Sequence, residues 1–193
     1  MKTKKINLTI TGCLGRMGQQ LIKSASKDKR FKINSLTENK LQRKKILGIL
    51  PKLNNSEAFK SSDVIIDFTI PKCTLEVLNI AAKQKKRVII GTTGFTLKEE
   101  NIIKKISKKI PILKAGNMSL GINLLMYLTE IASKSLGNNF LSKVFEAHHK
   151  FKKDHPSGTA LMLGQGIAIG KNRNLHRITV SYTHLTLPTN DQV

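Results

Sequence analysis

Up to Lys114, short apolar runs alternate with longer segments in which apolar residues recur at helical spacing. Five runs have the length of buried strands: Ile6–Ile10, Phe31–Leu36, Val64–Phe68, Arg87–Ile90 and Ile110–Lys114. Three intervening segments predict helices: Met17–Lys27, Thr74–Lys85 and Leu97–Lys108. The segment 39–62 contains Pro51 and the turn signal Asn54-Asn55, which indicate a short helix and a loop. Strands that alternate with helices are typical of βαβ units, so the pattern predicts an α/β fold with a parallel sheet.

The pattern changes near residue 118, where we expect a second domain to begin. A long, mostly apolar helix is predicted first, over Ile122–Leu136. The elements predicted after it are a strand over Lys143–Ala147, a helix over Thr159–Ile169 and a strand over His176–Val180. This second part therefore reads as a smaller α+β domain.

Composition is that of an ordinary folded chain. Of 193 residues, 39% are hydrophobic and 13 are glycine, which argues against disorder. No apolar run approaches the ~18 residues of a membrane span, and the N-terminal MKTKKINLTI lacks the apolar stretch of a signal peptide. We expect a cytoplasmic protein with no membrane partner.

The chain has two cysteines, Cys13 and Cys73. They are too few for a disulfide framework and form no CxxC pair for zinc.

The charge is strongly positive. Lys and Arg number 34 against 12 Asp and Glu, which gives a net charge of +22. Such a balance raises nucleic acid or an anionic membrane as a partner. However, the lysines are scattered through every segment together with Ile and Asn, as an AT-rich genome would impose, and aromatic residues make up only 5%. We therefore expect no nucleic-acid partner and keep a basic binding module as the non-enzymatic alternative.

A glycine-rich turn follows the first predicted strand. In TITGCLGRMGQQL, Gly12, Gly15 and Gly18 form a G-x-x-G-x-x-G pattern between a strand and a helix. Gly12 permits a tight turn, Gly15 lets the backbone approach a pyrophosphate, and Gly18 lets the helix pack closely on the strand. The free N–H groups and the dipole of the helix favour an anion. A turn without any ligand is the alternative reading.

Further candidate residues follow the other strands. Glu38 comes after the second strand, where a carboxylate can accept hydrogen bonds from an adenosine ribose, although a solvated surface glutamate explains it equally well. Three further segments, IIDFT from Ile65, IIGTTGF from Ile89 and AGNMSLG from Ala115, contain or directly follow the end of a predicted parallel strand. Thr and Gly at any one of these turns are explained more simply as loop formers. However, the carboxyl ends of parallel strands meet at one edge of the sheet, so three such turns in succession lead us to expect a shared ligand site.

The segment FEAHHKFKKDHPSGTA, residues 145–160, carries the most distinctive chemistry. Adjacent His148 and His149 point in opposite directions if the strand continues through them, and three lysines follow within five residues. Pro156 to Thr159 resembles a loop that enters a helix with its N–H groups exposed. This combination suits a small dicarboxylic acid that receives a proton from an imidazole or an ammonium group. The alternative is a basic surface loop, whereas a metal site fits less well because the histidines lack i, i+4 spacing.

Together these segments resemble the bacterial dihydrodipicolinate (4-hydroxy-tetrahydrodipicolinate) reductase family, over residues 5 to about 170. GCLGRMG, IDFT, GTTGF, AGNMSLG and EAHHKFKKDHPSGTA occur in the family's order. The resemblance implies a Rossmann-like dinucleotide-binding domain, 1–118, followed by a partial substrate and tetramerisation domain, 119–180. It also implies hydride transfer from NADH or NADPH to a cyclic dicarboxylic imine in lysine and diaminopimelate biosynthesis, by a homotetramer. Another small-acid dehydrogenase is the alternative enzyme.

The resemblance also implies roles for individual residues. The cofactor pyrophosphate is expected at Gly12, Cys13, Leu14, Gly15, Arg16 and Met17, with the ribose at Glu38. The nicotinamide side is expected at Gly91, Thr92, Thr93, Ala115, Gly116, Asn117 and Met118. His148 is expected to donate or accept a proton and Lys152 to be a second proton donor, while the substrate carboxylates are expected at His149, Gly158 and Thr159. No metal is implied.

Two departures from the family pattern affect these expectations. Many NADPH-using members place Arg after the glutamate, whereas this chain has Asn39 and then Lys40, which favours NADH and leaves NADPH open. The final residues, 181–193, contain no lysine and resemble translated sequencing adapter more than protein. We therefore expect a non-native tail, an incomplete second domain with exposed strand edges, poor solubility and little turnover.

Overall fold

The computed structural model describes residues 4–147 and 156–175 of the chain. Contacts between residues divide the chain into two compact units, Met1–Gly116 and Asn117–Val193. Each unit is described by itself below.

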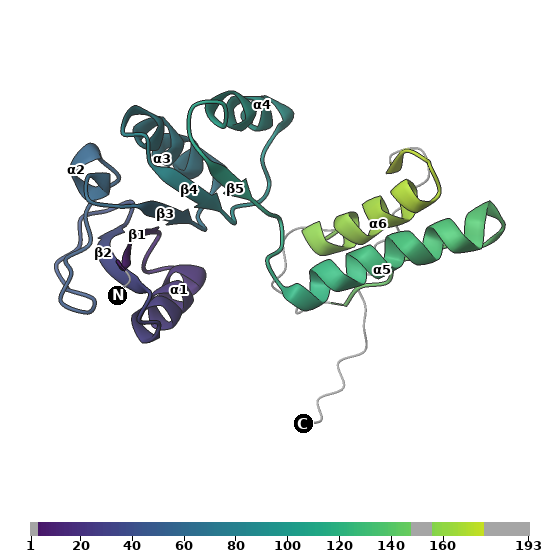
Figure 1. Ribbon diagram of the computed structural model, residues 1–193, viewed down its shortest axis with the longest axis horizontal. Coiled ribbons are helices and arrows are strands. Elements are labelled where there is room, and N and C mark those ends of the chain that lie inside the picture. The colour runs from purple at the N-terminus through teal and green to yellow at the C-terminus, as the bar shows by residue number, and fades with distance from the viewer. Residues whose placement is uncertain (1–3, 148–155, 176–193) are drawn as a thin grey trace. The chain divides into compact units, whose positions relative to one another are not determined.

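A five-stranded parallel sheet forms the centre of the first unit, with the strand order β2-β1-β3-β4-β5 (Figure 1). The strands are β1 (Ile6–Thr11), β2 (Phe31–Thr37), β3 (Val64–Asp67), β4 (Arg87–Ile90) and β5 (Ile112–Lys114). The strand order reverses between β1 and β3, and such a reversal opens a crevice at the carboxyl edge of the sheet. The predicted α/β class with a parallel sheet is confirmed.

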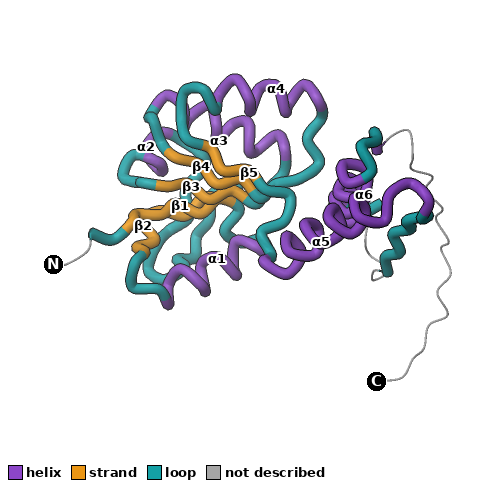
Figure 2. Tube along the Cα trace, turned by 45° about the vertical axis from the view of Figure 1, so that its right-hand side comes forward, coloured by secondary structure: helices purple, strands orange, loops and turns teal. Residues whose placement is uncertain are grey.

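Helices cover both faces of this sheet. They are α1 (Arg16–Lys27), α2 (Ser56–Phe59), α3 (Pro71–Lys83) and α4 (Leu97–Ile106). Figure 2 shows α1 on one face and the other three on the opposite face. Right-handed crossovers require this arrangement, because the chain moves from β1 to β2 in one direction and from β3 to β5 in the other.

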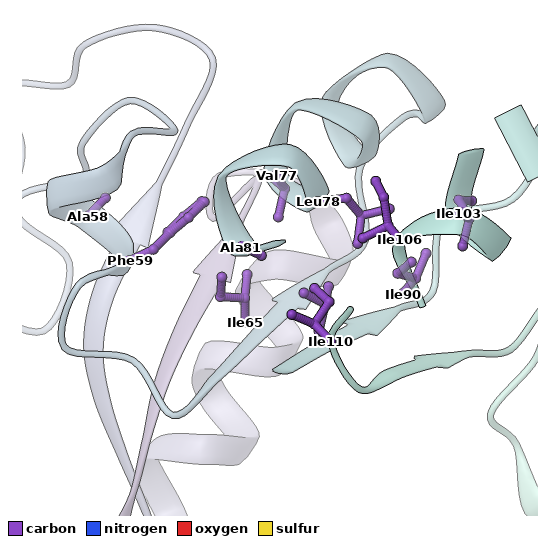
Figure 3. Packing of buried hydrophobic residues seen from close by; sticks show 11 residues of the cluster. Ala58, Phe59, Ile65, Val77, Leu78, Ala81, Ile90, Ile103, Ile106 and Ile110 are labelled. Atoms are coloured by element: carbon purple, nitrogen blue, oxygen red, sulfur yellow. The ribbon is translucent and has the colours of Figure 1, made fainter. Parts of the chain in front are cut away.

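A separate apolar cluster lies on each face of the sheet. On the side of α3 and α4, the buried residues include Phe59, Ile65, Leu78, Ile90 and Ile106 (Figure 3). A smaller cluster of Ile10, Cys13, Ile22 and Leu36 fills the α1 side. The sheet is therefore buried on both faces, and its carboxyl edge is left as the place where polar turns collect.

The segment 39–62 contains the predicted short helix, α2, and a loop. The N–H of Lys52 donates to the carbonyl of Leu36, and the N–H of Glu38 donates to the carbonyl of Lys52, at 2.9 Å each. These two bonds hold the loop beside the end of β2. Glu38 therefore has a fixed backbone position even though it lies beyond the strand.

Two long helices make up most of the described second unit: α5 (Leu120–Leu136) and α6 (Gly158–Gly170), with a short 3₁₀ turn at Gly137–Asn139. The backbones of these two helices lie close together, with only the hydrogen atoms of glycine between them at two positions. A Cβ atom at Gly170 would lie 2.4 Å from the carbonyl oxygen of Glu130, and one at Gly166 would lie 3.2 Å from that of Met126. Glycine at these two positions therefore permits the close approach of α6 to α5.

The predicted strand over Lys143–Ala147 is wrong, because residues 141–147 form no regular element. A strand needs a neighbour for its backbone hydrogen bonds, and no strand occurs in the described part of this unit. The other predicted strand, His176–Val180, and the expected tail, 181–193, lie outside the described residues. Within the described ranges, no helix is long and apolar enough to cross a membrane.

The close packing of α5 and α6 predicts the effect of a single methyl group. We expect Gly170→Ala to destabilise the chain by about 1–3 kcal/mol, because the new methyl meets backbone atoms that have little room to move. Gly121→Ala is the matched control, since an added Cβ there would lie 3.9 Å from its nearest neighbour, the Ser119 hydroxyl. Urea unfolding of both variants measures the difference, and equal stabilities would contradict the packing argument.

Candidate functional site

Two glycines at the turn after β1, Gly12 and Gly18, stand where a larger residue would be strained. Gly12 has a φ of +60°, and a Cβ there would lie 2.7 Å from Cγ2 of Thr69. A Cβ at Gly18 would lie 2.2 Å from the carbonyl oxygen of Gly12. Helix α1 therefore begins directly against the turn, as the predicted roles of Gly12 and Gly18 require.

The first turn of α1 presents its backbone N–H groups at the carboxyl edge. Gly15 is the N-cap, and none of the described side chains caps the helix. The N–H of Gly15 itself donates to the carbonyl of Gly12 at 3.0 Å. The first N–H groups of a helix, here those of Arg16 and Met17, have no acceptor within the helix, and with the helix dipole they attract an anion.

The Glu38 carboxylate lies beside this turn. One carboxylate oxygen accepts the Leu14 N–H at 3.1 Å, and the other accepts the N–H of Asn39 at 2.9 Å. Glu38 is thus held against the glycine turn by two backbone donors while it stays partly exposed, so its role toward a ribose remains a prediction beside the alternative of a solvated surface glutamate. Burial is the main cause that raises the pKa of the neighbouring Cys13 thiol to about 11, and the charge of Glu38 is the second cause. This thiol therefore stays protonated at neutral pH.

The turns after β3 and β4 meet at the same edge. The ring of Phe68 lies so close to Gly91 that a Cβ at Gly91 would be 2.0 Å from it. Thr92 is buried and Thr93 is exposed. Ala115, after β5, donates its N–H to the carbonyl of Ile90 at 3.1 Å, and Gly116 ends the unit in an exposed position.

Sequence reasoning missed the side chain that links these turns, Asp67. This carboxylate is fully buried at the end of β3 and accepts hydrogen bonds from four threonine hydroxyl groups, those of Thr11, Thr69, Thr74 and Thr92. A signal was present in the sequence, because three of these threonines stand at or just beyond the end of a strand. A buried acidic residue needs such donors, and the predicted topology brings them together.

In the second unit, the described candidates gather at the N-termini of α5 and α6. Asn117 accepts the Ser119 N–H at 2.8 Å, and its amide donates to the Thr159 hydroxyl at 3.4 Å. The Ser157 hydroxyl caps α6 by accepting the N–H of Ala160 at 3.1 Å. Met118 is exposed and takes part in none of these three hydrogen bonds. The structure therefore brings together Asn117 and Thr159, which the sequence assigned to different ligands.

The N-terminus of α6 is also fixed from the preceding segment. A Glu146 carboxylate oxygen accepts the Ser157 N–H at 2.8 Å, and Ser157 is buried. Gly158 stands at the first position of the helix, and outside its chain neighbours and the helix backbone no described residue lies within 4 Å of where its Cβ would be. His148, His149 and Lys152 lie outside the described residues. Among the described residues, no three His, Cys, Asp or Glu side chains gather in a way that could hold a metal ion.

Family models match most of the chain. One described as "Dihydrodipicolinate reductase, N-terminus" matches residues 6–118. Another, described as "Dihydrodipicolinate reductase, C-terminus", matches residues 121–189.

Individual proteins agree with these models. A 4-hydroxy-tetrahydrodipicolinate reductase from Pelagibacter ubique (strain HTCC1062) is 70% identical over 175 residues, which are 91% of this chain and 68% of that protein. The enzyme of the same name from Wolbachia pipientis subsp. Culex pipiens (strain wPip) is 39% identical over 85% of this chain and 66% of its own length. The chain thus spans about two thirds of the length of these relatives.

A solved structure supports the fold. The dipicolinate-bound dihydrodipicolinate reductase from Paenisporosarcina sp. TG-14 superposes with a TM-score of 0.65 at 24% identity, over 87% of this chain and 67% of that one. The resemblance inferred from the sequence motifs is confirmed, whereas the roles of individual residues, the domain boundaries and the homotetramer stay predictions. The chain belongs to the dihydrodipicolinate reductase family, the NAD(P)H-dependent 4-hydroxy-tetrahydrodipicolinate reductases of lysine biosynthesis.

Proposed function

We propose that the first unit binds a reduced nicotinamide dinucleotide across the turn after β1, with a preference for NADH. The observation that carries this proposal is the uncapped start of α1 beside the Glu38 carboxylate, at the point where the strand order reverses. A reversal of strand order is where open parallel sheets bind nucleotides. When bound, the nucleotide supplies the hydride.

The pyrophosphate is placed at the start of α1. The backbone N–H groups of Arg16 and Met17 and the positive end of the helix dipole favour its charge. Gly15, as the N-cap, has no side chain that would stand between the helix and an approaching phosphate. Exposed Arg16 adds a guanidinium group at the same helix end.

The ribose is placed at Glu38. Two backbone N–H groups hold this carboxylate in place, and its remaining lone pairs can accept hydrogen bonds from ribose hydroxyl groups. A 2′-phosphate, as in NADPH, would meet the negative charge of Glu38. Asn39 offers no guanidinium to compensate, and Lys40 offers only a point charge on an exposed, flexible side chain. The site therefore favours NADH over NADPH.

We further propose that the segment from Glu146 to Thr159 binds the dicarboxylic imine. The Ser157 hydroxyl caps Ala160, which leaves the N–H groups of Gly158 and Thr159 at the start of α6 for a substrate carboxylate. The solved Paenisporosarcina reductase holds bound dipicolinate, which is a dicarboxylate. His149 is assigned to the carboxylates by the family resemblance.

The family resemblance also assigns the proton transfer that accompanies hydride addition, and it assigns this step to His148 and Lys152. Hydride addition to a ring carbon of the imine leaves negative charge on the conjugated system. A cationic acid held close to this charge lowers the barrier by neutralising it. His148 donates or accepts this proton, and Lys152 acts as a second donor.

Cofactor preference tests the assignment at Glu38. NADH is expected to bind more tightly than NADPH, as measured by the fluorescence of the reduced nicotinamide on titration. Asn39→Arg is expected to tighten NADPH binding by about tenfold to a hundredfold, because a charged hydrogen bond to phosphate contributes about 1.5–3 kcal/mol.

Asn101→Arg is the matched control, because Asn101 is an exposed asparagine on α4 and the substitution changes the net charge equally. This control is expected to leave the NADH-to-NADPH ratio unchanged. An equal effect of both variants would show that overall charge, and not the site at Glu38, determines the preference.

The proton donors are tested by turnover. The assay uses a chimera in which residues 1–175 of this chain are followed by the C-terminal part of the Pelagibacter reductase, and it follows loss of NADH absorbance with the cyclic imine. His148→Ala and Lys152→Ala are each expected to lower kcat by about a hundredfold or more, with NADH affinity unchanged, because each removes a proton donor. Lys153→Ala is the control for loss of one lysine charge. A kcat equally reduced by Lys153→Ala would refute the role of Lys152.

A further inference from the structure

Asp67 joins three turns of the carboxyl edge through its buried carboxylate. One oxygen accepts the hydroxyl of Thr11 at 2.5 Å and that of Thr69 at 2.9 Å. The other oxygen accepts the hydroxyl of Thr92 at 3.0 Å and that of Thr74. These donors come from the end of β1, the turn after β3, the turn after β4 and helix α3.

Each of the three turn residues adjoins a residue of the proposed nucleotide site. Thr11 directly precedes Gly12, and the methyl group of Thr69 faces Gly12 closely enough to exclude a Cβ there. The Thr92 hydroxyl accepts the Thr69 N–H at 2.9 Å while it donates to Asp67, so it connects the turns after β3 and β4. The backbone carbonyl of Asp67 also accepts the N–H of Gly91 at 2.9 Å.

We propose that Asp67 is a positioning residue for nucleotide binding, whose carboxylate holds the turns that begin at Gly12, Phe68 and Gly91 in fixed relation to one another. This inference rests on the proposed function. Asp67 has no exposed surface, so it acts through Thr11, Thr69 and Thr92 and not by touching the nucleotide. Turns that are already in place when the nucleotide arrives lose little conformational freedom on binding.

The carboxylate is suited to this position because all four of its partners are hydroxyl donors. Asp67→Asn keeps the size of the side chain but replaces one acceptor oxygen by an NH₂ group. If that group faces Thr74 and Thr92, Thr74 can still donate to the carbonyl of Ile70, which lies 3.3 Å from its hydroxyl. Thr92 then loses the acceptor for its proton, and the turn at Gly91 is the part of the cluster that is loosened.

A purely structural role for the cluster can be separated from a positioning role by two threonines on β1. Thr9 and Thr11 are two residues apart on one strand, so they face the same side of the sheet, and both are fully buried. The Thr9 hydroxyl bonds to Ser62, at the amino end of β3, whereas the Thr11 hydroxyl bonds to Asp67 at the carboxyl end. Thr9→Val and Thr11→Val therefore each remove one buried hydroxyl, and only Thr11→Val affects the turns.

The test measures the Kd for NADH of the 193-residue chain and of Asp67→Asn, Thr11→Val and Thr9→Val, together with their melting temperatures. Titrations are done at a temperature at which circular dichroism shows every titrated variant to be folded. We expect Asp67→Asn and Thr11→Val to raise Kd about tenfold, since displaced site groups weaken binding steeply. Thr9→Val is expected to lower the melting temperature as Thr11→Val does while it leaves Kd within about twofold.

The outcomes distinguish this inference from the proposed function. If the unaltered chain binds NADH and Thr11→Val binds it equally well, the positioning role is refuted while the nucleotide site stands. A Kd raised equally by Thr9→Val and Thr11→Val also refutes it, because general loss of stability then explains both. If the unaltered chain binds no nucleotide, the proposed function fails and this inference fails with it. Thr11→Val decides the question if Asp67→Asn does not fold.

Discussion

The backbone contact between helix α1 and the turn after β1 is the constraint on which the first unit depends. With hydrogen atoms alone at Gly12 and Gly18, the helix starts directly against the end of the strand, and its first N–H groups face the edge where the turns after the other strands also end. Any larger residue at Gly18 would push the helix away from the Gly12 carbonyl. Two carboxylates then bind to a turn whose shape is already determined. Glu38 accepts the Leu14 N–H within the turn, and buried Asp67 accepts the hydroxyl of Thr11 just before it.

Much of this arrangement follows from local sequence pattern. Strand positions, helix order and the glycine turn were predictable because buried parallel strands are short apolar runs and because Gly12, Gly15 and Gly18 occur at one spacing. The hydroxyl cluster at Asp67 was missed, although the threonines at the strand ends gave a signal, because two of its donors, Thr11 and Thr92, lie 56 and 25 residues from Asp67 along the chain. The bond between Asn117 and Thr159 was missed for the same reason. Such contacts depend on tertiary packing, which spacing along the chain does not encode.

The second unit shows a different limit of pattern reading. The alternation at Lys143–Ala147 resembled a strand, yet a strand forms only where another strand supplies hydrogen bonds, and the apolar residues alone do not determine that. The helices were predicted well because their hydrogen bonds are internal. The structural role of Gly166 and Gly170 became evident only from the structure, in which the backbones of α5 and α6 are in contact at these two positions.

The way in which Glu38 is held bears on the proposed choice between the two coenzymes. Asn39 contributes only its main-chain N–H to that arrangement, and its side chain is exposed. Under the proposed ribose site at Glu38, a replacement of the Asn39 side chain would change coenzyme preference while the main-chain N–H that holds Glu38 is kept. Such a replacement would leave the packing of the first unit unchanged, because this side chain is exposed.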